Sequence, residues 1–543
     1  MTATLTTIRS ARLARSARSS LGTSRPSPST GWRSAWLVLV PIVAMSLLLG
    51  FFVNGILMAA PPLAALVAWA MITLPFQLVA PTVAGVMLTF NPPSARPADG
   101  VWKSPLDVVG SLIYKNLPIK LAIADLIIIL LVLRAAMIVA LGDGVRGAGT
   151  RKPPKPFAQA CVVVIAAMAF SSAYGLARGG DFRQILWQVR VPTLLACLAL
   201  AASVAATPLG IRRFRNAVLF AGMVKVALGT YFYYLILPGV ANPGEVLYVT
   251  IHSDSVLWSA GLAMLIAEWF EQRTIGARRR LIVFGLPLLF GMAINNRRTV
   301  WVAVGASVLF IAAVATPNVK RQLARLLAVG WPLIFAYVIV GLTAGSSSAI
   351  FKPVSMTESV LFQTDASSSS RDVENINLLY TNKLSRGIGS GFGHEYIELI
   401  PSVNLSEVFE QYKFIPHNSF LGLWAFMGIG GATAFFLLPT LGIFYATWAR
   451  RRSAVPWVRA AAAWSVCIVI AWLIQAWSDI GIQDWPTMIC CGFALGIGAS
   501  LARQVAEQGE LAGVSRDVAT PLEYATPAPR PATFGAVTET PSA

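Results

Sequence analysis

The chain of 543 residues is 56% hydrophobic and 12% charged, whereas soluble globular proteins carry about 25% charged residues. This excludes an ordinary soluble protein and indicates an integral membrane protein. The net charge of +19 does not favour a nucleic-acid partner, because the Lys and Arg residues fall in short runs between apolar segments and are not gathered on one soluble face.

The first segment, residues 1–34, contains six arginines and no acidic residue. Organelle transit peptides and basic cytoplasmic arms share this composition, and we interpret the segment as a cytoplasmic arm. The apolar run that follows, residues 35–54, is longer than the core of a signal peptide. It therefore predicts a retained first membrane span.

Apolar stretches of spanning length then recur through residues 35–502, and a bilayer-spanning helix needs about 20 mainly apolar residues. The pattern predicts an all-α integral membrane protein with 12 to 14 transmembrane helices, because four prolines in 57–90 allow two short spans or one broken span. The predicted spans are 35–54, 57–73, 75–90, 118–141, 157–175, 191–209, 217–237, 251–269, 281–296, 299–316, 326–343, 419–446, 460–478 and 485–502.

Charge and composition predict on which side of the membrane the segments between the spans lie. Most of the 43 Lys and Arg residues fall on the side that is cytoplasmic when the N-terminus is inside, which predicts cytoplasmic N- and C-termini. The loop 344–418 then lies outside, and its aromatic and aliphatic residues predict a partly helical extracytoplasmic loop. The tail 503–543 is rich in Ala, Pro and Thr and is predicted to be disordered and cytoplasmic.

Ionisable residues inside predicted spans are costly and often functional. Lys225 is interpreted as a residue that snorkels to a nearby span end, as the partner of a residue on another helix, or as a contact for a lipid diphosphate. The segment 252–255, His-Ser-Asp-Ser, begins another span. Its residues are typical of a helix cap, and sequence adjacency alone does not make them a catalytic triad.

The most informative string begins at Pro416, which favours an extended chain before it. Asn418 or Ser419 can cap the helix that follows, and this places His417 at the outer mouth of a span. An imidazole there could act as a general base near neutral pH. The alternative is an ordinary interfacial histidine before a span whose glycines allow close helix packing.

His417-Asn418, followed after nine residues by Gly428 and Gly431, resembles the signature of the O-antigen ligase and polymerase family. These are polytopic enzymes that transfer glycans from an undecaprenyl diphosphate carrier. The segment 386–393, Arg-Gly-Ile-Gly-Ser-Gly-Phe-Gly, resembles the family's Gly-x-Gly-x-Gly segment, and 296–299, Asn-Arg-Arg-Thr, resembles its Ser-Arg-Gly or Ser-Arg-Thr element. The resemblance covers residues 215–500, approximately.

The resemblance implies a GT-C-like fold and a metal-independent glycosyltransferase in the bacterial inner (plasma) membrane. In that family a periplasmic histidine is thought to activate the acceptor hydroxyl, which makes His417 the candidate base. Arginines hold the diphosphate of the donor, and the matching positions are Arg298, with Arg297 as its alternative, and Arg371. The active-site loop would comprise Gly387, Gly389, Gly391, Gly393 and Asn418. The glycines themselves predict tight turns, because Gly adopts backbone conformations closed to other residues.

The implied partners are an undecaprenyl-diphosphate-linked glycan donor, a glycan or lipid acceptor, membrane lipids and polysaccharide-assembly proteins. No metal, cofactor or nucleic acid is expected. Polymerisation of a surface polysaccharide is favoured over an O-antigen-type ligase that attaches the glycan to a lipid or protein acceptor. A transporter or flippase of lipid-linked oligosaccharide is the alternative from another class, although internal repeats typical of transporters are not evident in the sequence.

Overall fold

The structure is a computed structural model that describes residues 74–91, 122–141, 152–239, 249–344 and 366–518, apart from 296, 316, 405 and 407–409, together with a few isolated positions. The chain divides into a first unit, Met1–Leu74, and a second compact unit, Pro75–Ala543. The basic arm and the predicted spans 35–54 and 57–73 belong to the first unit and lie outside the described residues, apart from isolated positions.

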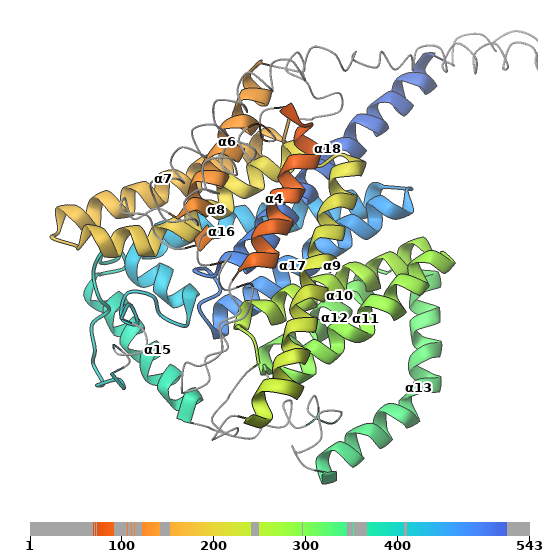
Figure 1. Cartoon of the computed structure of the whole chain (residues 1–543). Helices are drawn as coiled ribbons and strands as arrows, with labels where there is room; N and C mark the ends of the chain where they lie inside the picture. The colour runs from red at the N-terminus through yellow and green to blue at the C-terminus, as the bar shows by residue number, and fades with distance from the viewer. Residues whose placement is uncertain are drawn as a thin grey trace, which may run out of the picture. The chain divides into compact units, whose positions relative to one another are not determined.

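Helices form the second unit, and its described residues contain no β-strand. This confirms the predicted all-α class for that part of the chain. In chain order (Figure 1) the helices are α4 (Phe76–Phe90), α6 (Ile123–Leu141), α7 (Lys155–Ala177), α8 (Phe182–Ala205), α9 (Pro208–Tyr231), α10 (His252–Gln272), α11 (Ile275–Ile294), α12 (Arg298–Val314), α13 (Pro317–Ala344), α15 (Ala366–Leu384), α16 (Ser419–Arg452), α17 (Pro456–Ser478) and α18 (Trp485–Val518).

Seven of the described helices are long and apolar enough to cross a membrane, and a bent pair within α13 would make an eighth. The seven are α6, α7, α8, α9 with its extension to Gly239, α16, α17 and α18 up to Gln508. A multi-pass membrane protein is therefore indicated by the length and composition of its helices.

Every predicted span from residue 75 onward holds a helix, but not every helix has the properties of a full span. The helices α4 and α12 have 15 and 17 residues, fewer than the roughly 20 that a bilayer requires. Three consecutive arginines lie near the start of α11, and α10 has polar residues at both ends. The predicted 12 to 14 spans thus exceed the seven or eight that qualify among the described residues.

The helix α10 lies among its neighbours, with 16 of its 21 residues buried. Its Trp258 is fully buried and donates a hydrogen bond from Nε1 to the carbonyl of Gly222 on α9 at 3.0 Å. A Cβ at Gly291 of α11 would lie 3.2 Å from the indole. Small residues at such crossings let helices approach closely in a membrane, and here they let α9 and α11 pack tightly around Trp258 of α10.

Both regions predicted to lie outside the spans contain helix, as was predicted for the outer loop. The segment 344–418 contains α15, a helix of 19 residues. The last helix, α18, continues to Val518, past residue 503, where a disordered tail was expected to begin. Arg503 and Glu507 form an ion pair one turn apart at 2.9 Å, and such i,i+4 pairs favour continued helix.

Candidate active site

The start of α16 has the local structure that its sequence predicts. Asn418 is the N-cap, and its side-chain oxygen accepts a hydrogen bond from Leu421 N at 3.1 Å. Ser419 Oγ lies 3.4 Å from the carbonyl of Asp479 and accepts a hydrogen bond from Ile482 N at 3.4 Å. The beginning of α16 is therefore joined to the link between α17 and α18.

The helix α15 carries a cationic and an anionic side chain on one face. Arg371 and Glu374 are three residues apart, so they share one face of the helix. Glu374 is buried, and its Oε2 lies 2.8 Å from His417 Nδ1, while Oε1 accepts a hydrogen bond from the His417 backbone N–H. Glu374 thus fixes both the ring and the backbone of His417.

Asp479, the C-cap residue that follows α17, belongs to a second group of polar side chains near His417. His252, the first residue of α10, places Nδ1 2.5 Å from Asp479 Oδ2. The other ring nitrogen of His252, Nε2, lies 2.9 Å from a guanidinium nitrogen of Arg297, the N-cap of α12. Helix ends from α10, α12, α16 and α17 therefore bring two histidines, a carboxylate and an arginine together.

The charges of this cluster shift the pKa values of His417 and Asp479 in opposite directions. Burial lowers the pKa of His417, but the hydrogen bond and charge of Glu374, with the charge of Asp479, outweigh burial and hold this pKa above its ordinary value. Burial would raise the pKa of Asp479, yet the neighbouring His252, His417 and Arg371 hold it well below its usual range. The pKa of His417 is therefore raised, and that of its neighbouring carboxylate, Asp479, is lowered.

The glycine segment has a structural role that its composition predicts. Gly387, Gly389, Gly391 and Gly393 have φ values of 76°, 92°, 84° and 89°, a region that side chains with a Cβ rarely adopt. A Cβ at Gly389 would lie 2.4 Å from the backbone nitrogen of Gly428. The predicted tight turns are present, and they are packed directly against α16.

A break in α16 explains why the segment packs there. Gly428 has φ 70° and ψ 177° inside the helix, so backbone groups around it lose their usual helical partners. Ile429 N donates to the Gly387 carbonyl at 2.9 Å, and the Ala425 and Phe426 carbonyls accept from Ser390 N and Gly391 N, each at 2.9 Å. The glycine segment thus completes the hydrogen bonding of the kinked helix.

The structure brings together most of the predicted site residues. His417 and Asn418 lie at the start of α16, Arg371 of α15 acts on His417 through its charge, and Arg297 joins them through His252 and Asp479. Arg298, the preferred of the two arginines, is the first residue of α12, and its neighbour Arg297 contacts His252. The four glycines support the kinked helix.

Three members of the cluster were not identified from the sequence: Glu374, Asp479 and His252. Glu374 carried a usable signal, because it lies one turn after Arg371 on a helix within the outer loop. His252 and Asp479 begin and end predicted spans on the same side of the membrane, but their pairing is a long-range contact between α10 and α17. Spacing along the chain does not encode that contact.

The intramembrane charges have partners on other helices. Lys225 on α9 and Asp254 on α10 are both fully buried, with 3.3 Å between Nζ and Oδ1. Lys225 also donates a hydrogen bond to the carbonyl of Asn91. This confirms the interpretation of Lys225 as the partner of a residue on another helix, and its complete burial contradicts a contact with a lipid diphosphate.

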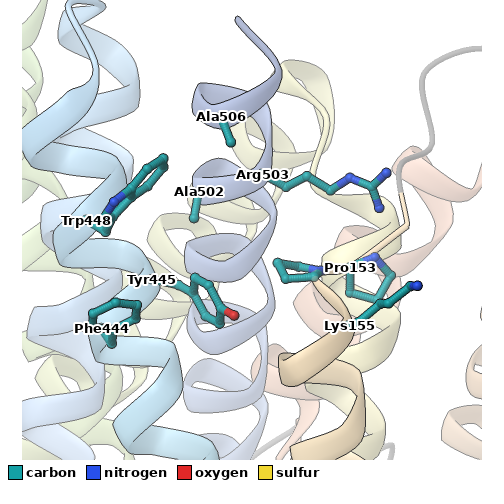
Figure 2. A pocket seen from close by; sticks show the side chains of 9 residues that line it. Pro153, Lys155, Phe444, Tyr445, Trp448, Ala502, Arg503 and Ala506 are labelled. Carbon is teal, nitrogen blue, oxygen red and sulfur yellow. The ribbon is translucent and has the colours of Figure 1, made fainter. Parts of the chain in front are cut away.

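Two cavities lie at the other ends of the same helices. One, of about 450 Å³, has an aromatic wall of Phe444, Tyr445 and Trp448 near the end of α16, with Arg503 of α18 and Lys155 of α7 on its opposite side (Figure 2). The other, of about 460 Å³, is lined by residues of α9, α10, α11 and α17. Both are separated from His417 by the length of the helices.

Neither a family model nor a curated protein matches this chain. Its function therefore has to be argued from the cluster around His417.

Proposed function

We propose that the chain is a glycosyltransferase of the bacterial inner membrane, with cytoplasmic termini, that moves a glycan from an undecaprenyl-diphosphate carrier to an acceptor hydroxyl in surface polysaccharide polymerisation. The observation that carries the proposal is the pairing of His417 with Glu374 beside Arg371 and Asp479. A general base needs an oriented ring, a pKa near the working pH and an accessible nitrogen. Glu374 orients the ring of His417, whose pKa lies above the ordinary value. The His417 side chain is 31% exposed, and no described residue hydrogen-bonds its Nε2.

In this proposal Nδ1–H of His417 donates to Glu374, and Nε2 removes the proton from the acceptor hydroxyl. The acceptor oxygen bonds to the anomeric carbon of the donor sugar, and the bond from that carbon to the carrier phosphate breaks. Undecaprenyl diphosphate leaves with the electron pair. Arg371 and Arg297, with Arg298 as the neighbouring candidate, stabilise the developing charge, because guanidinium groups bind phosphate oxygens in pairs. A direct displacement of this kind inverts the anomeric centre.

The test is a reaction of the purified, vesicle-reconstituted protein with an undecaprenyl-diphosphate-linked oligosaccharide repeat. We expect carrier-linked chains of several repeats and one released undecaprenyl diphosphate for each bond formed. Transfer only to an added lipid or protein acceptor would replace polymerisation by ligation. Carrier-linked repeats that cross the bilayer without a new glycosidic bond would overturn the proposal in favour of a transporter.

Replacing Glu374 by Gln should move the pH dependence of transfer. Because His417 must be neutral to act as a base, activity falls as the pH drops through its pKa, which Glu374 holds above the ordinary value of about 6.5. Loss of the carboxylate charge lowers that pKa, and the acid limb should shift downward by about one pH unit. The maximal rate should fall about tenfold through poorer orientation of the ring.

The transfer rate between pH 5 and 9 measures this shift. The matched control is Asp372→Asn, which removes the same charge from an exposed position of α15 and should leave the acid limb in place. An acid limb that Glu374→Gln does not move would remove Glu374 from the site.

A further inference from the structure

The cavity of about 460 Å³ lies at the end of the helices opposite the His417 cluster. The helix α10 begins at His252, within the cluster, and ends at Gln272, which lines the cavity. The helix α17, one of the seven long and apolar enough to cross a membrane, runs the same way: Trp457 in its first turn lines the cavity, and Asp479 of the cluster follows its last residue. The cavity and the candidate active site therefore belong to opposite faces of the membrane.

The lining of this cavity is strongly basic. It contains Arg212, Arg215 and Arg280 and a single acidic residue, Glu268, which leaves a net charge of +2. Glu268 is held by Arg215 at 2.6 Å and by Arg280 at 2.9 Å, while Arg212 has no ion pair or hydrogen bond among the described residues. The buried Nε of Arg280 likewise has no hydrogen-bond partner there. Donors remain available for an anion.

Aromatic residues and helix ends add to this basic lining. Trp457 and Trp464 of α17 line the cavity together with the apolar Ile211. Tryptophan is enriched where helices meet the membrane interface. Pro208 and Trp457 lie in the first turns of α9 and α17, where the partial positive charge of the helix N-terminus favours an anion.

We propose that this cavity binds the phosphate of an anionic phospholipid, with the headgroup among the arginines and the acyl chains along the apolar residues. Arginine forks bind phosphate oxygens in pairs, and basic pockets between transmembrane helices bind anionic lipid headgroups. A lipid is favoured over a soluble phosphate, because the cavity lies at the helix ends and its lining is partly apolar.

Native mass spectrometry of the full-length protein in detergent tests the proposal. The protein is titrated with phosphatidylglycerol or with zwitterionic phosphatidylethanolamine, for wild type and for two single variants. Arg212→Ala removes the arginine that has no partner in the cavity. Arg213→Ala removes its neighbour, which is exposed and does not line the cavity. Neither arginine has a side-chain hydrogen bond or ion pair with another described residue, so neither substitution should destabilise the fold.

We expect wild type and Arg213→Ala to bind phosphatidylglycerol at least fivefold more tightly than phosphatidylethanolamine. Arg212→Ala should lose most of that preference at an unchanged melting temperature. Equal affinity for the two lipids, or an equal loss in both variants, would overturn the proposal. Displacement of phosphatidylglycerol by millimolar inorganic phosphate would also overturn it, by identifying a site for a free anion.

Discussion

His417→Ala is expected to lower the rate of glycan transfer by about 10² to 10⁴, the range that a positioned general base contributes. The variant removes the imidazole but leaves Asn418 to cap α16 and Glu374 on α15, so the helices retain their ends. Binding of the carrier-linked donor should persist, because the arginines assigned to the diphosphate are unchanged. The measurement is the single-turnover rate of transfer at matched protein abundance, together with donor affinity.

The chain supplies a matched control, because it contains only three histidines. His394 lies next to the glycine segment, and its Nε2 is 3.2 Å from the carbonyl of Gly175 on α7. It has no contact with the Glu374 and Asp479 carboxylates, so His394→Ala should transfer glycan at nearly the wild-type rate. Comparable losses in both variants would trace the defect to folding and leave His417 without a catalytic role.

The helical class could be predicted from the sequence because the apolar runs are long and separated by charged segments. The number of spans could not, since apolar length says little about whether a helix faces lipid or protein. The helix α10 carries Asp254 and Glu268 at buried positions, and both are paired with residues of α9. A helix that is covered by protein tolerates charges that a lipid-facing helix would not.

Local features of the site were also predictable from the sequence. Asn418 was expected to cap α16, and the glycine segment was expected to form tight turns, because caps and positive φ angles depend on a few adjacent residues. The part of the structure against which those turns pack was not predictable. Their partner is the break at Gly428, and the contact between Gly389 and that break joins residues 39 positions apart.

The charges around His417 come from distant parts of the chain. Glu374 lies 43 residues before His417, and His252 and Asp479 come from the opposite ends of α10 and α17. The choice between Arg297 and Arg298 depended on which side of a helix start faces this cluster. The motif alone could not decide that, and the contact from His252 to Arg297 is a long-range one that the motif does not contain.

Lys225→Met should destabilise the protein by about 3 to 5 kcal/mol, the cost of removing one partner from a buried ion pair. The substitution keeps much of the side-chain volume but leaves Asp254 fully buried without its counter-charge. It also removes the hydrogen bond to the Asn91 carbonyl. The expected result is a large fall in melting temperature in detergent and in membrane abundance.

The double variant Lys225→Met, Asp254→Leu separates a charge effect from a packing effect. Replacing a complete buried ion pair by apolar residues is often neutral or stabilising, so the second substitution should restore most of the lost melting temperature. Because Asp254 follows His252 by two residues, the pair also fixes the start of α10, where His252 meets Asp479. A double variant that is stable but slow in glycan transfer would show that the pair positions His252. A double variant no more stable than Lys225→Met would show that the volume of Lys225, and not its charge, holds α9 and α10 together.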